Sequence, residues 1–276
     1  MRKANFYNHI LVSVVLLLFG FYKGACQDTN ESYDAHQNSS KDLFNHQEIP
    51  IEGLVAKYKP SEVLDYETAR EVLFTEIYNE NDTIRCVYSN YKLPVLKSEE
   101  DPISKLLKLN PLKSIIAEHS YPKSKGAKDG NAKSDMHHLF PVRLGVNVAR
   151  YKHPFANISD NDCLSWYNDV DRFQSKPVGD LSKYAKKAKE AFEPQDNFKG
   201  NVARAVFYFF TMYRDEAMTE DDAFFELQRR TLLEWHQEDP IDALELERTY
   251  LIATYQSEKV NPFVIDETLA LRLYGY

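Results

Sequence analysis

The sequence predicts a single mixed α+β domain that is mostly helical. Short β-branched or apolar runs at residues 83–88 and 113–117 have the length and composition of strands. No internal repeat, heptad array or obvious linker interrupts the chain after residue 50. A long apolar stripe at helical spacing follows Gly200, and its members are Val202, Ala205, Val206, Phe209, Met212 and Tyr213.

The composition is that of a globular protein with a packed core. Of the 276 residues, 43% are hydrophobic and 13% are aromatic, which is ample for one large domain. The formal net charge of −8 argues against a protein that coats nucleic acid indiscriminately, because such binding depends on many Lys and Arg contacts to phosphate.

The N-terminus has the features of a secretory signal peptide covering residues 1–26. Arg2 and Lys3 precede an apolar run at 10–21 that is too short to span a bilayer comfortably, and small residues end at Cys26. Lipidation of Cys26 is the alternative. No later segment is apolar enough to cross a membrane, so we expect a soluble protein that is secreted or periplasmic after removal of the signal peptide.

Residues 27–50 are polar and lack a sustained period, so they are expected to form a flexible leader. The catalytic domain would then cover 51–276. Loss of Cys26 with the signal peptide would leave Cys86 and Cys163, an even pair in an oxidising compartment. The sequence leaves open whether they form a disulfide.

The first half of the domain is expected to contain both helices and strands. A helix is expected from Tyr66, with Asp65 or Thr68 near its start. The strand candidate at 113–117 leads into Glu118, and a mobile loop is expected at 123–133. Residues 137–140 are then expected to form the returning strand, and Pro141 to open a short helix over 142–149.

The C-terminal third is expected to be helical. Beyond the stripe after Gly200, helices are expected at 220–235 and from Pro240 to about Gln256, and Asn261-Pro262 should end that run because proline cannot continue a helix.

The region from Glu118 to Arg150 concentrates side chains suited to phosphodiester hydrolysis. His119 titrates near neutrality and can take a proton from water. Glu118 and Asn147 are hard oxygen ligands suited to Mg²⁺. Arg150 lies one helical turn after Asn147, so it shares a face with it and can reach the same phosphate.

Positive charge surrounds these side chains. Between Lys105 and Lys152 there are ten Lys or Arg against only Glu118, Asp129 and Asp135. We expect Lys125 and Lys128 of the loop to contact substrate phosphate, and activity to fall as salt rises. The alternative is an ordinary solvated lysine face.

Three further polar residues lie nearby. His137 and His138 with His119 could form a zinc site, but adjacent strand residues point to opposite faces, so at most one of the two would join. Asp135 is expected to orient backbone or a histidine. We therefore assign Asp135, His137 and His138 supporting roles and keep a zinc-dependent hydrolase as an alternative.

The ordered combination of these motifs resembles the bacterial endonuclease I family. The resemblance covers roughly residues 60 to 266. It is carried by Glu118-His119, Pro122 and Ser124, then Ser134-Asp135-Met-His137-His138-Leu-Phe-Pro141, Val146-Asn147-Val-Ala-Arg150, Pro154-Phe155, Phe192-Glu193-Pro194, Lys199-Gly200-Asn-Val-Ala203-Arg204, Phe207-Tyr208, Glu247-Arg248, Gln256 and Asn261-Pro262-Phe263.

The resemblance implies a secreted or periplasmic nuclease with a ββα-metal, or His-Me finger, site. His119 would be the general base, and Glu118 and Asn147 would bind Mg²⁺, with Mn²⁺ or Ca²⁺ as substitutes. Such enzymes cleave DNA, and often RNA, with little sequence preference and leave 5′-phosphates. The chain departs from the family at Tyr121, where tryptophan is frequent, in its lysine-rich loop, and at 256–260, where the family often has Gln-Gly-Asn.

We therefore expect a monomeric, Mg²⁺-dependent and largely sequence-non-specific endonuclease. An inactive exported nucleic-acid-binding protein is a second alternative, against which the intact Glu118, His119 and Asn147 speak. We assign Arg204 and Arg248 to structural ion pairs, with substrate contact as the alternative.

Overall fold

A computed structural model describes residues 50–96 and 113–276. The expected signal peptide and leader lie outside the described residues, except for Pro50. Helices alternate with small antiparallel sheets in the described part, which confirms the mixed α+β class. None of the helices within these ranges combines the length and the apolarity that a membrane span requires.

The N-terminal helices follow the sequence closely. Helix α1 covers Ile51–Tyr58, and α2 covers Tyr66–Val72 and continues as a single π-helical turn, η2, at Leu73–Ile77. The Asp65 carboxylate caps α2 by accepting hydrogen bonds from two backbone N–H groups of its first turn, each at 3.1 Å. The helix predicted from Tyr66 is confirmed, with Asp65 as its cap.

Two hairpins come next. Strands β1 (Thr83–Arg85) and β2 (Lys92–Pro94) pair with each other, so the strand expected at 83–88 is shorter than predicted. Strands β3 (Ile115–His119) and β4 (Leu139–Arg143) form the second antiparallel pair. Helix α5 (Leu144–Arg150) follows β4 directly.

The register of this second hairpin corrects two expectations. The returning strand runs from Leu139 to Arg143, so it contains only the second half of the expected 137–140, and Pro141 does not open a helix. The short helix expected over 142–149 is α5, which begins at Leu144. Pro141 instead lies inside β4 opposite Ala117, and its carbonyl accepts a hydrogen bond from the Val87 N–H at 3.0 Å. A proline is tolerated there because each strand of a two-stranded sheet is an edge strand, with one side free of ladder bonds.

The segment between β3 and β4 contains regular structure where a mobile loop was expected. It forms two 3₁₀ turns, η4 (Lys123–Lys125) and η5 (Met136–His138), on either side of the short helix α4 (Gly130–Ser134). His137 and His138 thus belong to a turn and are not strand residues.

The sequence did not predict a four-stranded antiparallel sheet that the structure contains. Its order is β6-β5-β7-β8, from β5 (Ser165–Asn168), β6 (Asp171–Phe173), β7 (Ala185–Lys187) and β8 (Phe192–Glu193). Turns η6 (Leu181–Lys183) and η7 (Asp196–Phe198) flank its later strands. Strands of two to four residues are too short to show a clear alternation.

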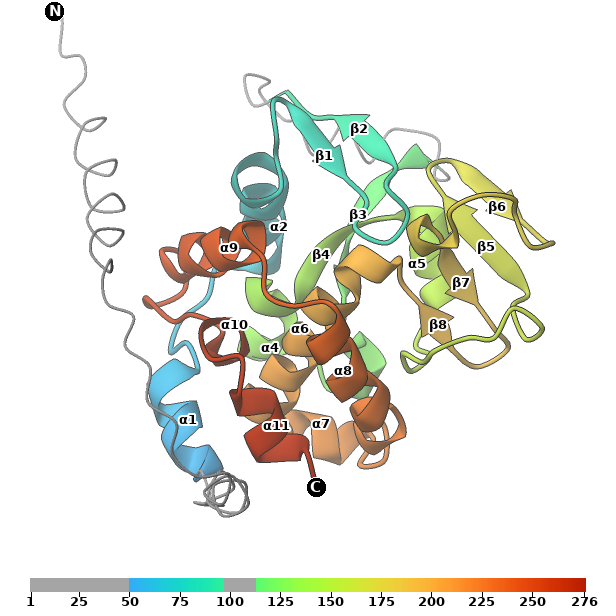
Figure 1. Cartoon of the computed structure of the whole chain (residues 1–276). Coiled ribbons are helices and arrows are strands. Elements are labelled where there is room, and N and C mark those ends of the chain that lie inside the picture. Colours follow the sequence, from blue (N-terminus) through green and yellow to red (C-terminus); the bar gives the residue numbers. More distant parts are fainter. Residues whose placement is uncertain (1–49, 97–112) are drawn as a thin grey trace, which may run out of the picture. The chain divides into compact units, whose positions relative to one another are not determined.

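The C-terminal helices form the other half of the described fold (Figure 1). They are α6 (Lys199–Met212), α7 (Arg214–Glu220), α8 (Glu226–Glu238), α9 (Ala243–Ala253), α10 (Pro262–Ile265) and α11 (Leu269–Tyr274). Every residue of α6 is buried, which makes it the central helix and confirms the apolar stripe. The two later helices predicted are confirmed with shifted ends, and Pro262 begins a new helix, α10.

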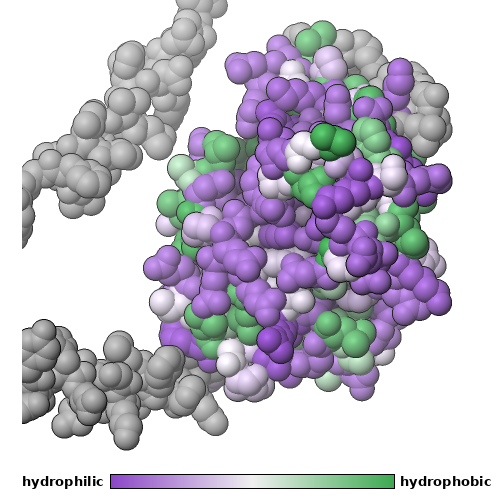
Figure 2. Space-filling view, turned by 45° about the vertical axis from the view of Figure 1, so that its right-hand side comes forward, coloured by the Kyte–Doolittle hydropathy of each residue, from purple (hydrophilic) through white to green (hydrophobic). Residues whose placement is uncertain are grey.

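Buried ion pairs link these helices. Arg204 of α6 donates hydrogen bonds to the Glu245 carboxylate of α9 from Nε at 2.9 Å and from Nη2 at 2.6 Å, and Arg248 lies 3.6 Å from the same carboxylate. Both arginines are therefore structural. On the face shown in Figure 2, hydrophobic residues occur in small separate groups among hydrophilic ones.

Candidate active site

The candidate site is a pocket of about 640 Å³ across the end of β3. Glu118 and His119 are the last two residues of this strand, paired with Phe140 and Leu139 of β4. Because α5 begins where β4 ends, the hairpin carries the helix and its Asn147 to the same pocket. Two strands and one helix thus bring together Glu118 and Asn147, which are 29 residues apart in the chain (147 − 118).

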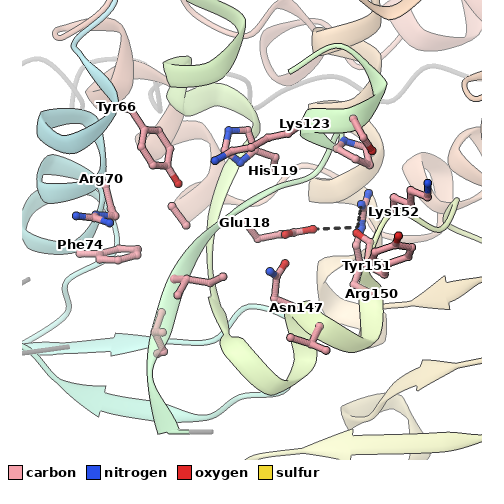
Figure 3. A pocket seen from close by; sticks show the side chains of 16 residues that line it. Tyr66, Arg70, Phe74, Glu118, His119, Lys123, Asn147, Arg150, Tyr151 and Lys152 are labelled. Atoms are coloured by element: carbon pink, nitrogen blue, oxygen red, sulfur yellow. Dashed lines mark hydrogen bonds and ion pairs between the residues drawn. The ribbon is translucent and has the colours of Figure 1, made fainter. Parts of the chain in front are cut away.

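Glu118 is a buried carboxylate without a full set of partners. Burial raises its pKa to about 7, although the Arg150 guanidinium opposes this shift. Arg150 Nε lies 3.2 Å from Glu118 Oε1, but the two groups are not aligned as a hydrogen bond (Figure 3). Oε1 is therefore attracted by a charge and still lacks a hydrogen-bond donor among the described residues.

Asn147 presents a second oxygen of the same kind. Its Oδ1 is buried and accepts no hydrogen bond from the described residues. Figure 3 shows its carboxamide next to the Glu118 carboxylate. Buried polar atoms normally have partners, and carboxylate and carboxamide oxygens are the ligands that Mg²⁺ and Ca²⁺ take. The pair thus has the chemistry to hold a divalent cation.

His119 is oriented so that one nitrogen remains an acceptor. Its Nε2 lies 2.9 Å from the carbonyl oxygen of Lys133. A carbonyl only accepts, so Nε2 must carry the hydrogen, and Nδ1 of the neutral ring is the acceptor. Burial, the neighbouring His138 and nearby cations lower the pKa of His119 well below its usual value. The neutral ring, the form that can act as a base, is the stable one.

Neighbouring rings fix the plane of the His119 imidazole. Tyr66 of α2 stacks against it with centroids 5.7 Å apart, and His138 meets it edge-on at 5.4 Å. Lys123 and Lys133 in turn place their ammonium groups over the Tyr66 ring, at 4.6 and 5.2 Å from its centroid. Tyr66 was not singled out from the sequence, since nothing local marks it as a site residue.

The supporting residues lie behind the pocket wall. Asp135 is fully buried and accepts hydrogen bonds from the Tyr208 and Tyr213 hydroxyls at 2.7 and 2.8 Å. It also accepts from the backbone N–H of His137 at 3.0 Å, which shapes the η5 turn. His138 Nε2 lies 2.7 Å from the Ala132 carbonyl.

The zinc alternative does not fit this arrangement. His119, His137 and His138 each direct Nε2 at a backbone carbonyl. Within residues 50–96 and 113–276, no three His, Cys, Asp or Glu side chains gather as a metal-binding group. The two cysteines in these ranges, Cys86 and Cys163, are free thiols.

The cations of the pocket differ from those expected. Lys128 pairs with Glu220, the last residue of α7, and Lys125 pairs with Asp221, the next residue. Neither lysine lines the pocket. Lys123 and Lys152 line it. The sequence excess of lysine indicated a cationic surface, but it could not show which lysines have acidic partners far along the chain.

Arg150 was expected to reach the same phosphate as Asn147, and the structure shows which groups already contact its guanidinium. Its side chain is fully buried, and it donates hydrogen bonds to the carbonyls of Ser120 and Tyr151. It lines the pocket from below the surface and holds the ends of β3 and α5 together. Its charge acts on Glu118.

The fold and the pocket together place a neutral imidazole beside two unsatisfied oxygens in a pocket that is also lined by cations. A family model with the description Endonuclease I matches residues 32–268. The chain belongs to the Endonuclease I family, which supports a hydrolase acting on phosphodiester bonds.

Curated relatives agree with this membership. The chain is similar to an extracellular ribonuclease of Bacillus subtilis (strain 168), with 30% identity over 53% of this chain and 49% of the relative. It is also similar to an extracellular ribonuclease of Bacillus amyloliquefaciens, with 28% identity over 53% of this chain and 49% of the relative. The chain spans about half the length of these curated relatives.

Proposed function

We propose that this chain is an exported, divalent-metal-dependent endonuclease that hydrolyses phosphodiester bonds of DNA and RNA with little sequence preference. The proposal includes a ββα-metal site formed by β3, β4 and α5, with the chain acting as a monomer. The family membership supports the reaction class.

One observation carries the proposal. Glu118 Oε1 and Asn147 Oδ1 are both buried and both lack hydrogen-bond partners among the described residues, within a pocket lined also by His119. Keeping such atoms unsatisfied costs free energy, and a divalent cation would satisfy both. Mg²⁺ held there, with Mn²⁺ or Ca²⁺ as substitutes, would neutralise charge on the phosphate oxygens and assist the leaving oxygen.

The protein residues perform the remaining steps. His119 Nδ1 accepts a proton from a water molecule, and the hydroxide so formed attacks phosphorus. The bond to the 3′ oxygen breaks, which leaves a 5′-phosphate. Lys123 and Lys152 contact the flanking phosphates from the pocket wall, and the buried Arg150 holds Glu118 in place. These contacts address phosphate and not base edges, which accounts for low sequence preference.

The relatives and the N-terminal residues support the proposed substrate and location. The relatives' names refer to RNA and to the extracellular space. The N-terminal 26 residues have the pattern of a signal peptide. We therefore include RNA beside DNA and propose that the mature protein acts outside the cytoplasm.

The test combines substrate and metal. Plasmid DNA and an RNA transcript are each incubated with the purified protein in Mg²⁺, Mn²⁺, Ca²⁺ or Zn²⁺, and in EDTA. We expect cleavage of one or both substrates with Mg²⁺ and none in EDTA. If both substrates stay intact with every metal, the proposed function is wrong, and if only Zn²⁺ supports cleavage, the Glu118 and Asn147 site is wrong.

A further inference from the structure

Tyr151 has a backbone conformation that disfavours its side chain. It directly follows α5 with φ of +52° and ψ of −124°. The His153 N–H donates to the Arg150 carbonyl at 3.2 Å and closes a turn over Tyr151 and Lys152. These angles are those of the first central position of a type II′ turn, where glycine is the favoured residue. A bulky side chain is rare in this conformation, and strained backbone of this kind clusters at active sites and ligand clamps.

The strained turn places an aromatic ring at the mouth of the pocket. Tyr151 lines the pocket that holds Glu118 and Asn147 (Figure 3). The residue nevertheless remains 61% exposed. Val148, one turn earlier on α5, lines the same pocket and is 66% exposed. Together they form an apolar rim within a turn of the candidate metal ligand Asn147.

Tyr66 provides a contrast, since it also lines the pocket. Its ring is stacked against His119 and lies under the ammonium groups of Lys123 and Lys133. Tyr66 therefore orients the His119 imidazole, and the faces of the Tyr66 ring are already in contact with His119 and the two lysines. Tyr151 has a tilted neighbour, His153, at 5.6 Å, and the flexible side chain of Lys152 at 5.5 Å, and most of its surface is open.

The flat, exposed ring next to a lysine matches a nucleotide. Any of the nucleobases can stack on an aromatic ring, because each has a flat π-face, while an ammonium group binds the attached phosphate. In a duplex the base faces are already stacked on their neighbours, so only an unpaired base can take up this position.

We propose that Tyr151 stacks on an unpaired nucleobase next to the scissile phosphate, and that it thereby favours single-stranded over duplex substrates. The inference rests on the proposed function, because it uses the same pocket. It adds a preference for unpaired bases that phosphate contacts alone would not give.

Binding without metal tests the inference separately from catalysis. Fluorescence anisotropy in EDTA compares a short labelled single strand with an abasic strand of the same length. We expect the wild type to bind the base-bearing strand more tightly, and Tyr151→Ala to weaken that binding by roughly tenfold while changing abasic binding little. Tyr151→Phe should behave as the wild type.

Two further variants address folding. Tyr151→Gly suits the turn and lacks the ring, so it should remain folded and lose the base-dependent affinity as Tyr151→Ala does. Tyr250→Ala, which removes a 55% exposed tyrosine on α9 outside the pocket lining, is the matched control and should bind as the wild type.

Equal binding of both strands by the wild type would overturn the inference, and so would an equal loss on both strands in Tyr151→Ala. Cleavage of the same two strands with Mg²⁺ is measured in parallel. A protein that shows the Tyr151-dependent binding but cleaves neither strand would contradict the proposed function and leave the stacking role supported.

Discussion

Glu118 and Asn147 hold oxygens that the fold itself leaves unsatisfied. The charge of Arg150, 3.2 Å from Glu118 Oε1, offsets part of the cost of burying the carboxylate, but it donates no aligned hydrogen bond. A site that keeps such a carboxylate ready for a cation loses stability when the cation is absent. At the residue scale, the unsatisfied oxygens that suit the pocket to a cation should therefore lower the free energy of unfolding of the metal-free protein.

Glu118→Gln should stabilise the metal-free protein at alkaline pH. Between the usual pKa of 4.5 and the folded value of about 7, the folded state keeps a proton that the unfolded chain loses, so stability falls as pH rises through this window. The variant cannot ionise and should gain on the order of 2 kcal/mol at about pH 8 and little at about pH 4. Denaturant unfolding in EDTA measures this.

The same variant should lose nuclease activity in Mg²⁺, because a carboxamide is a weaker ligand than a carboxylate. A variant that unfolds at the same denaturant concentration as the wild type at both pH values would contradict the raised pKa of Glu118.

At the element scale, the long helices and the order of the motifs could be predicted, but the register of short strands could not. The apolar stripe of α6 extends over several turns, so its period is clear. Pro141 suggested a helix start, because a proline favours the first helical turn and an edge strand alike. Only the pairing with Ala117 decides between them.

The segment between β3 and β4 illustrates the same limit. Gly126 and Gly130 suggested a mobile loop, yet Gly126 is buried and packs closely against α7. A Cβ on Gly126 would lie 2.9 Å from backbone atoms of Glu216 and Ala217. The sequence shows the glycines but not the helix that approaches one of them.

Gly126→Ala should therefore destabilise the protein by roughly 2 kcal/mol or more, because its φ is +128° and the methyl group meets backbone. Gly130→Ala is the matched control. Its φ is also positive, at +57°, but a Cβ there meets nothing within 4 Å, so a loss of about 1 kcal/mol is expected. Thermal unfolding compares the two, and equal losses would contradict the close packing of this segment on α7.

At the scale of the whole molecule, charge is unevenly distributed. The chain carries a net charge of −8, yet Lys123, Lys152 and the buried Arg150 line the pocket. The sequence revealed this local excess. It could not show that acidic residues at the end of α7 pair with Lys125 and Lys128, since these partners lie more than ninety residues away in the chain.

Lys123→Met should reduce the salt dependence of kcat/KM on a single strand. Each lysine–phosphate contact with a single strand contributes about 0.7 to the slope of log affinity against log salt concentration. Loss of one contact should therefore reduce the slope of log kcat/KM against log salt concentration by roughly 0.7. Lys128→Met is the control and should keep the wild-type slope, because Lys128 is paired with Glu220 outside the pocket lining. If Lys128→Met lowered the salt slope and Lys123→Met did not, Lys128 and not Lys123 would be the lysine that contacts substrate phosphate.

The central claim is that the neutral His119 is the base of a metal-dependent phosphodiesterase site. His119→Gln tests it most directly, because the Gln amide can keep donating to the Lys133 carbonyl while offering no basic nitrogen. The measurement is the single-turnover rate constant for strand cleavage at saturating Mg²⁺. We predict a loss of about a hundredfold or more relative to the wild type, with unchanged thermal stability. A variant that cleaves at the wild-type rate would contradict the account.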